Sequence, residues 1–99
     1  IGSEEGKHRP IIITRTYKNS PMCTVIPLTS ERLGDGYWYH IDLENRDNTA
    51  LVEQMRVVDL RRIDKPIEKQ GRIETITKND AERIAVQVDW LYSIKIPQK

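Results

Sequence analysis

Residues 53–59 read Glu53-Gln54-Met55-Arg56-Val57-Val58-Asp59, so a glutamate, an amide and an arginine are set into a run that is otherwise typical of a β-strand. Two earlier blocks also place polar residues beside apolar runs. They are Gly6-Lys7-His8-Arg9-Pro10-Ile11-Ile12-Ile13 and Val25-Ile26-Pro27-Leu28-Thr29-Ser30. A strand needs none of these polar residues, so the three blocks together indicate a defined fold that carries a polar site.

The first half of the chain is rich in β-branched and aromatic residues, with turn residues between the runs. This pattern predicts strands over 10–16, 23–29, 37–43 and about 50–58. One helical turn over 59–62 follows, with Asp59 as its cap. Short strands in close succession favour a small antiparallel barrel or an open sheet over a βαβ unit.

The C-terminal part of the chain changes to a helical period. Thr77 can cap a helix, and Asp80 stands three residues on, as in a capping box. Apolar residues then recur at steps of three and four, at Ala81, Ile84, Ala85, Val88 and Leu91. Trp90 and Tyr92 flank this stripe, and we expect them to pack at the core or its rim. The sequence therefore predicts a mainly β chain with a C-terminal helix, class α+β.

Composition limits the possible classes of protein. A length of 99 residues suits one domain with one modest core. No apolar run approaches the roughly 18 residues that cross a bilayer, so a membrane partner is not expected. The net charge of +1 gives no global attraction to a polyanion, so any nucleic-acid binding must be local. Cys23 is the only cysteine, which rules out an intrachain disulfide, favours the cytoplasm and suits a core position.

In their order and approximate spacing, the three blocks resemble the MazF/PemK family of toxins. The family pattern is Gly-x-x-Arg-Pro before an apolar run, then Pro-(Ile/Leu)-Thr-Ser, then (Asp/Glu)-Gln-x-Arg-x-(Val/Ile)-Asp. The resemblance implies a small SH3-like barrel of the MazF/PemK/CcdB type, with residues 1–99 as a single toxin domain. Family members normally begin with a further strand ahead of the segment that matches Gly2-Ser3-Glu4. We therefore expect a domain that lacks this first strand, with an edge open to pairing with another chain.

The resemblance also implies a function. Such toxins are sequence-specific, metal-independent endoribonucleases that need no cofactor, cleave single-stranded RNA and leave a 2′,3′-cyclic phosphate and a 5′-hydroxyl. It further implies a homodimer and a cognate antitoxin protein that neutralises the toxin. The alternatives are a catalytically silent binding module on the same barrel, a gyrase-inhibiting CcdB-like toxin, or an unrelated SH3-like interaction domain.

Metal-free RNA cleavage needs a proton acceptor for the 2′-hydroxyl, a group that stabilises charge on the phosphate, and a proton donor for the leaving oxygen. The resemblance places the family's catalytic arginine at Arg9, its threonine at Thr29 and the acidic residue of some relatives at Glu53. A guanidinium fits phosphate oxygens with fixed donors, and a hydroxyl adds a neutral hydrogen bond. The expected RNA-binding or supporting residues are Lys7, His8, Arg15, Ser30, Gln54 and Arg56.

The identity of the general base and acid stays open at this point. His8 and His40 are alternatives to Glu53, because imidazole titrates near neutral pH. His8 precedes Arg9 directly, whereas His40 lies in a strand pattern that suits a surface residue. We expect Gln54 and Arg56 to be buried between a strand and the next turn, where they support the loops of the catalytic residues. One cysteine and two widely spaced histidines predict no metal site.

Overall fold

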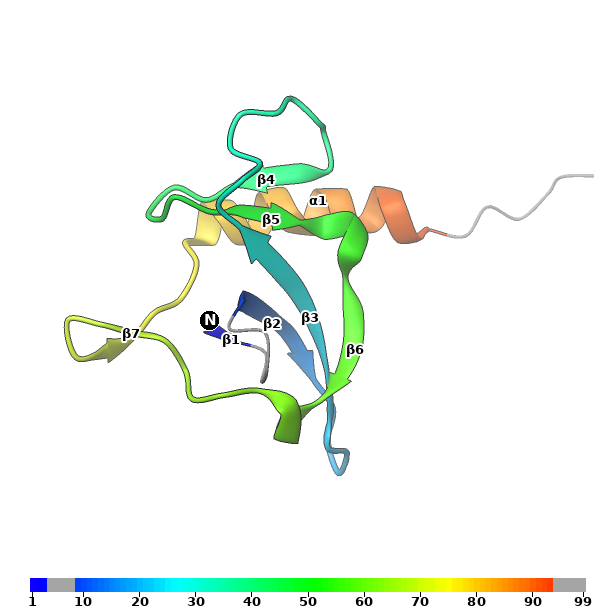
Figure 1. Cartoon of the computed structure of the whole chain (residues 1–99). Helices are drawn as coiled ribbons and strands as arrows, with labels where there is room; N and C mark the ends of the chain where they lie inside the picture. The colour runs from blue at the N-terminus through cyan, green and yellow to red at the C-terminus, as the bar shows by residue number, and fades with distance from the viewer. Residues whose placement is uncertain (4–8, 94–99) are drawn as a thin grey trace, which may run out of the picture.

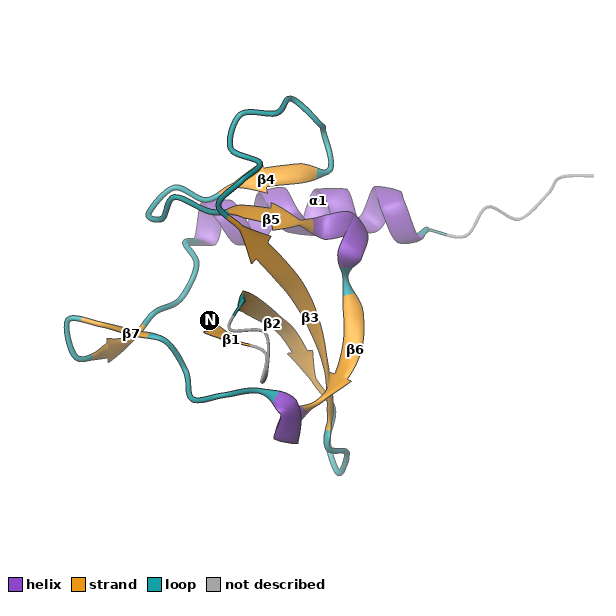
Figure 2. Ribbon diagram, in the orientation of Figure 1, coloured by secondary structure: helices purple, strands orange, loops and turns teal. Residues whose placement is uncertain are grey.

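A computed structural model of the chain describes residues 1–3 and 9–93, which form a main antiparallel sheet, a separate hairpin and a C-terminal helix (Figures 1 and 2). The strands are β1 (Gly2–Ser3), β2 (Pro10–Thr16), β3 (Met22–Thr29), β4 (His40–Asp42), β5 (Thr49–Leu51), β6 (Arg56–Asp59), β7 (Glu68–Lys69) and β8 (Arg72–Ile73). Two short 3-10 helices, η1 (Val52–Gln54) and η2 (Leu60–Arg62), and the α-helix α1 (Lys78–Tyr92) complete the described elements. The expected mainly β chain with a C-terminal helix is confirmed.

Strand β3 is the centre of the main sheet. Its first half, Met22 to Val25, pairs with β6, its end pairs with β5, and β2 runs along its other edge. Residues 23–28 are all buried, because both faces of the sheet are covered at this strand. The strand order is β1-β2-β3-β5-β4, with β6 also paired to β3. Among the described strands the sheet stays open rather than closing into a barrel, because β1 and β4 are only two and three residues long.

Buried side chains form two clusters on opposite faces of the sheet. The alternation of a strand sends Ile11 and Ile12 to different clusters. The larger cluster lies between the sheet and α1 and contains Ile12, Ile26, Leu28, Ile41, Leu43, Ala50, Val52 and Ile84. The smaller contains Ile11, Cys23, Val25 and Val58. Cys23 is fully buried, as expected of a core cysteine.

Helix α1 packs part of the predicted apolar stripe on the larger cluster, whereas Ala81 and Ala85 of that stripe are exposed. Ile84 is buried there, and Val88 and Leu91 are partly buried against it. The expected packing of Trp90 is wrong, because 68% of this residue is exposed. Tyr92 reaches inward through its hydroxyl, which donates to the Val52 carbonyl at 2.8 Å. The 15 residues of α1 fall short of a bilayer span, and no helix in the described part of the chain is long and apolar enough to make one.

The start of α1 is fixed by a network of polar groups. The Thr77 hydroxyl oxygen accepts from the backbone N–H of Asp80 at 3.0 Å and donates to the Glu44 carboxylate at 2.6 Å. The Asp80 side chain is 1% exposed and accepts from the Glu44 backbone N–H at 3.0 Å and from the Arg83 guanidinium. The predicted N-cap is therefore confirmed, and it also ties the helix to the turn between β4 and β5.

The aromatic run before β4 does not continue the strand, so the predicted strand 37–43 is reduced to β4. Gly34 and Gly36 have positive φ angles of 70° and 82°, and the His40 N–H donates to the Tyr37 carbonyl at 3.0 Å, closing a turn. The rings of Tyr37 and Tyr39 stack on each other with centroids 5.5 Å apart. Their alternation therefore reflects contact within a loop rather than a half-buried strand.

The predicted strand over about 50–58 is also interrupted. Its residues divide into β5, η1 and β6, and the turn is closed by the Met55 N–H donating to the Val52 carbonyl at 3.2 Å. The hairpin β7–β8 was not expected at all. Gln70 and Gly71 have φ angles of +54° and +76°, which suit the two central residues of a type I′ hairpin turn.

Candidate active site

Arg9 immediately precedes β2 and Thr29 ends β3, so the two residues expected to be catalytic lie at the same end of this antiparallel strand pair. Ile11 pairs with Pro27 and Ile12 with Ile26. Arg9 and Thr29 each lie two residues beyond the Ile11–Pro27 pair, and a residue before proline favours the extended backbone that would continue this register. Arg9 is exposed and Thr29 is half-buried.

The surroundings of Thr29 leave its hydroxyl proton available. Its Oγ1 accepts from the Glu31 backbone N–H at 3.2 Å, so the O–H is free to donate to another acceptor. Thr29 pairs with Thr49 of β5, whose hydroxyl donates to Asp42 at 2.7 Å. The second carboxylate oxygen of Asp42 accepts from the Gly34 N–H at 3.1 Å. These contacts anchor the loop that follows Thr29 to β4.

Glu53 lies toward the other end of β5. Thr49 pairs with Thr29, whereas Leu51 pairs with His40. Glu53 follows Leu51 by two residues, and its Oε2 lies 2.7 Å from His40 Nε2. The structure therefore groups Glu53 directly with His40, while Thr29 stands beside the start of the three-residue strand β5.

His40 lies between two carboxylates. Besides the contact to Glu53, its Nδ1 lies 2.7 Å from Asp35 Oδ2. The His40 side chain is 7% exposed, so the expectation of a surface histidine is wrong. The edges of Tyr37 and Tyr39 contact the ring, at centroid distances of 5.4 Å and 4.9 Å. We call His40, Asp35 and Glu53 the His40 cluster.

Electrostatics in the His40 cluster favour an imidazolium ion. Burial alone would lower the pKa of His40, but the hydrogen bonds and negative charges of Glu53 and Asp35 outweigh it and raise this pKa above its ordinary value. The pKa of Asp35 is lowered: burial opposes the shift, and the Tyr37 N–H and His40 overcome it. Both shifts favour the charged forms, an imidazolium ring for His40 and a carboxylate for Asp35.

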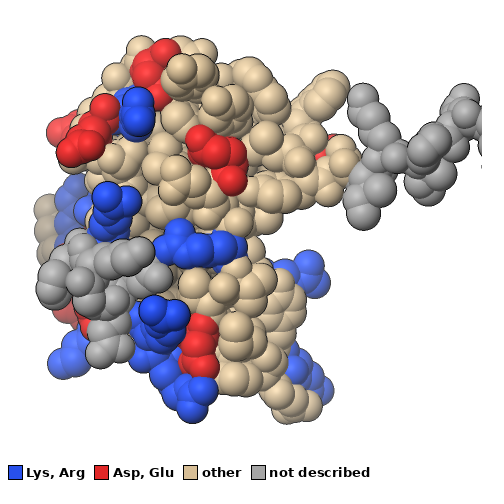
Figure 3. Space-filling view, turned by 45° about the vertical axis from the view of Figure 1, so that its right-hand side comes forward, with Lys and Arg blue, Asp and Glu red and all other residues tan. Residues whose placement is uncertain are grey.

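The basic side chains gather on one part of the surface. In Figure 3 the blue side chains concentrate in the lower half of the molecule, and the upper half is mostly tan with some red. The lower half holds β2, β6 and their adjoining turns in Figure 1. The basic residues of these elements are Arg9, Arg15, Lys18, Arg56, Arg61 and Arg62. They do not all share one face of the sheet, because Arg15 pairs with Thr24 on the face toward α1 and Arg56 pairs with Val25 on the opposite face.

The other expected site residues have different settings. The Arg15 guanidinium carbon lies 5.9 Å from the centroid of the Tyr17 ring. Ser30 is exposed in the turn after β3. Gln54 is exposed, which contradicts its expected burial, whereas Arg56 is half-buried in β6. Lys7 and His8 lie outside the described residues.

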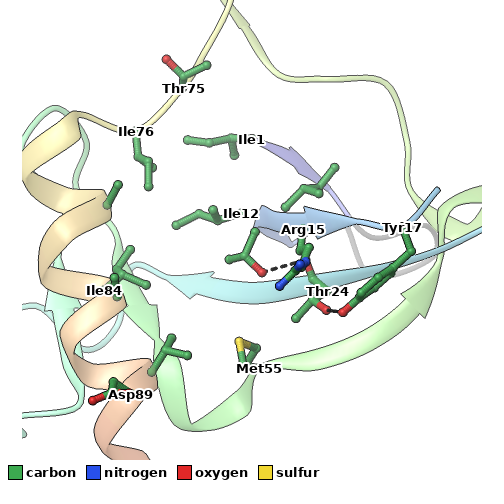
Figure 4. A pocket seen from close by; sticks show the side chains of 15 residues that line it. Ile1, Ile12, Arg15, Tyr17, Thr24, Met55, Thr75, Ile76, Ile84 and Asp89 are labelled. Carbon is green, nitrogen blue, oxygen red and sulfur yellow. Dashed lines mark hydrogen bonds between the residues drawn. The ribbon is translucent and has the colours of Figure 1, made fainter. Parts of the chain in front are cut away.

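A cleft of about 750 Å³ opens between the sheet and α1 (Figure 4). Its sides are mainly apolar, with Ile12 from β2 and Ile84 from α1 on facing sides. Arg15 and Tyr17 lie at its polar margin, where the Tyr17 hydroxyl and Thr24 Oγ1 are 2.7 Å apart. Such a lining suits an apolar chain segment better than a phosphate.

Among the described residues, no group of three His, Cys, Asp or Glu side chains is arranged to hold a metal ion. In the His40 cluster both imidazole nitrogens already face a carboxylate oxygen. The chemistry that this surface offers is therefore that of arginine, hydroxyl, carboxylate and imidazole groups.

Comparison with known proteins identifies the family. Among solved structures, the Mycobacterium tuberculosis toxin MazF-mt6 is similar, with a TM-score of 0.69 and 13% sequence identity over 96% of each chain. At that identity the likeness shows the fold alone. No curated protein sequence matches the chain significantly. A family model described as PemK-like, MazF-like toxin of type II toxin-antitoxin system matches residues 1–91. The chain therefore belongs to the PemK-like, MazF-like toxins of type II toxin–antitoxin systems.

Proposed function

We propose that this protein is a sequence-specific, metal-independent endoribonuclease toxin that cleaves single-stranded RNA. The observation that supports the proposal most is the β2–β3 register in a chain of this toxin family: its end pair is Ile11 with Pro27, and Arg9 and Thr29 lie two residues beyond it at the same end. The exposed Arg9 guanidinium is one donor for phosphate oxygens, and the Thr29 hydroxyl, which donates to no group in the described part of the chain, is proposed as a second. The proposal assigns contacts with the rest of the RNA strand to basic residues in and around β2 and β6.

The proposed reaction is an internal transfer within the RNA. Glu53 lies with His40 toward the other end of β5 from Thr29, so the proposal requires the reacting nucleotide to span both places: its 2′-hydroxyl gives its proton to the Glu53 carboxylate, and the 2′-oxygen forms a bond to phosphorus. The bond from phosphorus to the 5′-oxygen breaks, and that oxygen takes a proton from water. The products are a 2′,3′-cyclic phosphate and a 5′-hydroxyl. Arg9 and Thr29 donate to the phosphate oxygens as negative charge grows on them.

The proposal includes partners and a location. Type II toxin–antitoxin systems pair a toxin with an antitoxin, so a cognate antitoxin protein that covers the RNA surface is proposed here. A homodimer is proposed as well, because Val57 and Leu60 leave apolar surface exposed beside β6, at 56% and 37% of each residue. The substrate places the activity in the cytoplasm.

The cleavage test uses Arg9→Ala with Arg72→Ala as a matched control. Both arginines are exposed, but Arg72 lies in β8 of the separate hairpin. With a long mixed-sequence RNA in EDTA, Arg9→Ala should cleave on the order of a hundredfold more slowly than the wild type, the usual effect of removing one transition-state donor. Arg72→Ala should cleave normally. Equal cleavage by Arg9→Ala with an unchanged circular dichroism spectrum would remove Arg9 from the mechanism.

A second test separates an enzyme from a protein-binding module. Binding of an uncleavable RNA should weaken steeply with salt, because each neutralised phosphate releases counterions. Three or four contacts at roughly −0.7 each give a log–log slope of about −2 to −3. With a net charge of only +1, that slope requires the local basic surface. A slope near zero would leave the binding module as the better account.

A further inference from the structure

The His40 cluster joins three segments that are distant in sequence. Asp35 lies in the loop before β4, His40 begins β4, and Glu53 lies in η1. We propose that His40 is a positioning residue for Glu53. Its imidazolium ring is anchored by Asp35 on one side and holds one carboxylate oxygen of Glu53 on the other, so that the second oxygen of Glu53 can act on RNA. This inference rests on the proposed function and adds a residue and a pH dependence to it.

With both carboxyl groups ionised, the two contacts are satisfied together by a doubly protonated ring. Both imidazole nitrogens lie 2.7 Å from a carboxylate oxygen. A neutral imidazole donates from only one nitrogen, and a carboxylate can only accept. Two such contacts are therefore satisfied together only when both nitrogens carry hydrogen. Loss of one proton must break or reverse one of the two contacts.

Of the two carboxylates in the His40 cluster, Glu53 is the one with an oxygen left to accept a proton. Asp35 is held in place through its second oxygen, which accepts from the Tyr37 N–H at 3.0 Å. The ring of His40 is enclosed by Tyr37 and Tyr39. In Glu53, Oε2 is held by His40, whereas Oε1 has no hydrogen bond within the described part of the chain, and the side chain is 30% exposed. One oxygen thus orients the carboxylate and the other is left to accept a proton.

The charged groups around the cluster set the sign of the pH effect. Asp35 and Glu53 face the ring of His40, the positive charge of Arg32 acts on Asp35, and the Tyr92 hydroxyl is influenced by Glu53. The pKa of His40 lies above its ordinary value. Both hydrogen bonds of the His40 ring are therefore present below that pKa, and one of them is lost as pH rises through it. RNA cleavage should therefore have an alkaline limb that follows deprotonation of His40.

The experiment measures cleavage rate against pH for the wild type, His40→Gln, Asp35→Asn and the control Glu31→Gln. His40→Gln keeps one amide donor but no titrating proton, so its kcat should fall about tenfold to a hundredfold with little change in KM. Its alkaline limb should disappear. Asp35→Asn keeps an oxygen for the Nδ1–H but loses the charge, so the limb should move down by about one pH unit. Glu31→Gln removes an exposed carboxylate from the same loop and should leave the limb in place.

A readout without RNA accompanies the rates. The chain has two histidines, and NMR titration of the full protein resolves their rings, with His40→Gln assigning the signal of His40. Asp35→Asn should lower the measured pKa of His40 together with the kinetic limb. If the wild type cleaves RNA and its alkaline limb is the same in His40→Gln and Asp35→Asn, the role of His40 is overturned while the proposed function stands. A wild-type protein that cleaves no RNA at any pH would overturn the proposed function first, and this role with it.

Discussion

Replacing Asp80 by asparagine should destabilise the protein by about 2 kcal/mol. Asp80 is 1% exposed, and its two oxygens accept from the Glu44 N–H and from Arg83. Asparagine keeps one oxygen and turns an N–H₂ donor toward the other partner, which is also a donor. A hydrogen bond to a charged group contributes about 1.5–3 kcal/mol, and the part from Arg83 is smaller because its side chain is 39% exposed.

The assay is urea unfolding followed by circular dichroism, with Asp89→Asn as the control. Asp89 is an exposed aspartate of the same helix, so its replacement should change the unfolding free energy by less than about 0.5 kcal/mol. For Asp80→Asn the melting temperature should fall by about 8–16 °C, at roughly 4–8 °C per kcal/mol in a domain of this size. A loss of less than about 0.5 kcal/mol would refute the argument that this carboxylate fastens α1 to the β4–β5 turn.

Three further outcomes follow from local structure. Hydrogen bonds from the Arg61 side chain and backbone lower the pKa of Asp59 to about 2. The ionised Asp59 therefore stabilises the fold above its unfolded pKa, and this stability is lost as pH falls toward 2. The difference in urea midpoint between the wild type and Asp59→Asn should vanish over that pH range. Burial, with a smaller effect of the negative charge of Asp59, raises the pKa of the Cys23 thiol. Alkylation of Cys23 by iodoacetamide should therefore be slow in the native protein and fast in urea, and fast alkylation of the native protein would contradict the buried position. Gln70→Asn should raise the melting temperature slightly, because Asn-Gly suits the positive φ angles of Gln70 and Gly71 better; a lower melting temperature would argue against the type I′ turn.

The sequence predicted the elements that rest on local signals. Strands β2 and β3 have long β-branched runs, and α1 has both a cap at Thr77 and an apolar stripe. The loop over 37–39 was mistaken for a strand because stacked tyrosines produce the same alternation as a half-buried strand. The turn at η1 had no local signal, since Val52 to Gln54 contains no glycine or proline. Hairpin β7–β8 had its signal in Gln70-Gly71, but its strands lack an apolar face.

The candidate site was predictable only in part. Three short blocks pointed to Arg9, Thr29 and Glu53, because their residue types and order resemble a known pattern. The setting of His40 could not be predicted, since its partners are five residues before it and thirteen after it, and only the folded chain brings them together. The exposure of Gln54 likewise follows from the turn at η1 rather than from any pattern in the strand.

Strand β3 has a consequence for how the molecule opens. The same eight residues hold β2 on one edge and both β5 and β6 on the other. Only loss of β3 itself would take the pairing partner from β2 and from β5 and β6 at once. The backbone amides of β3 should therefore exchange with deuterium most slowly, whereas those of the β7–β8 hairpin exchange through local fraying. A protease should consequently cut the native toxin first at this hairpin and reach β3 last.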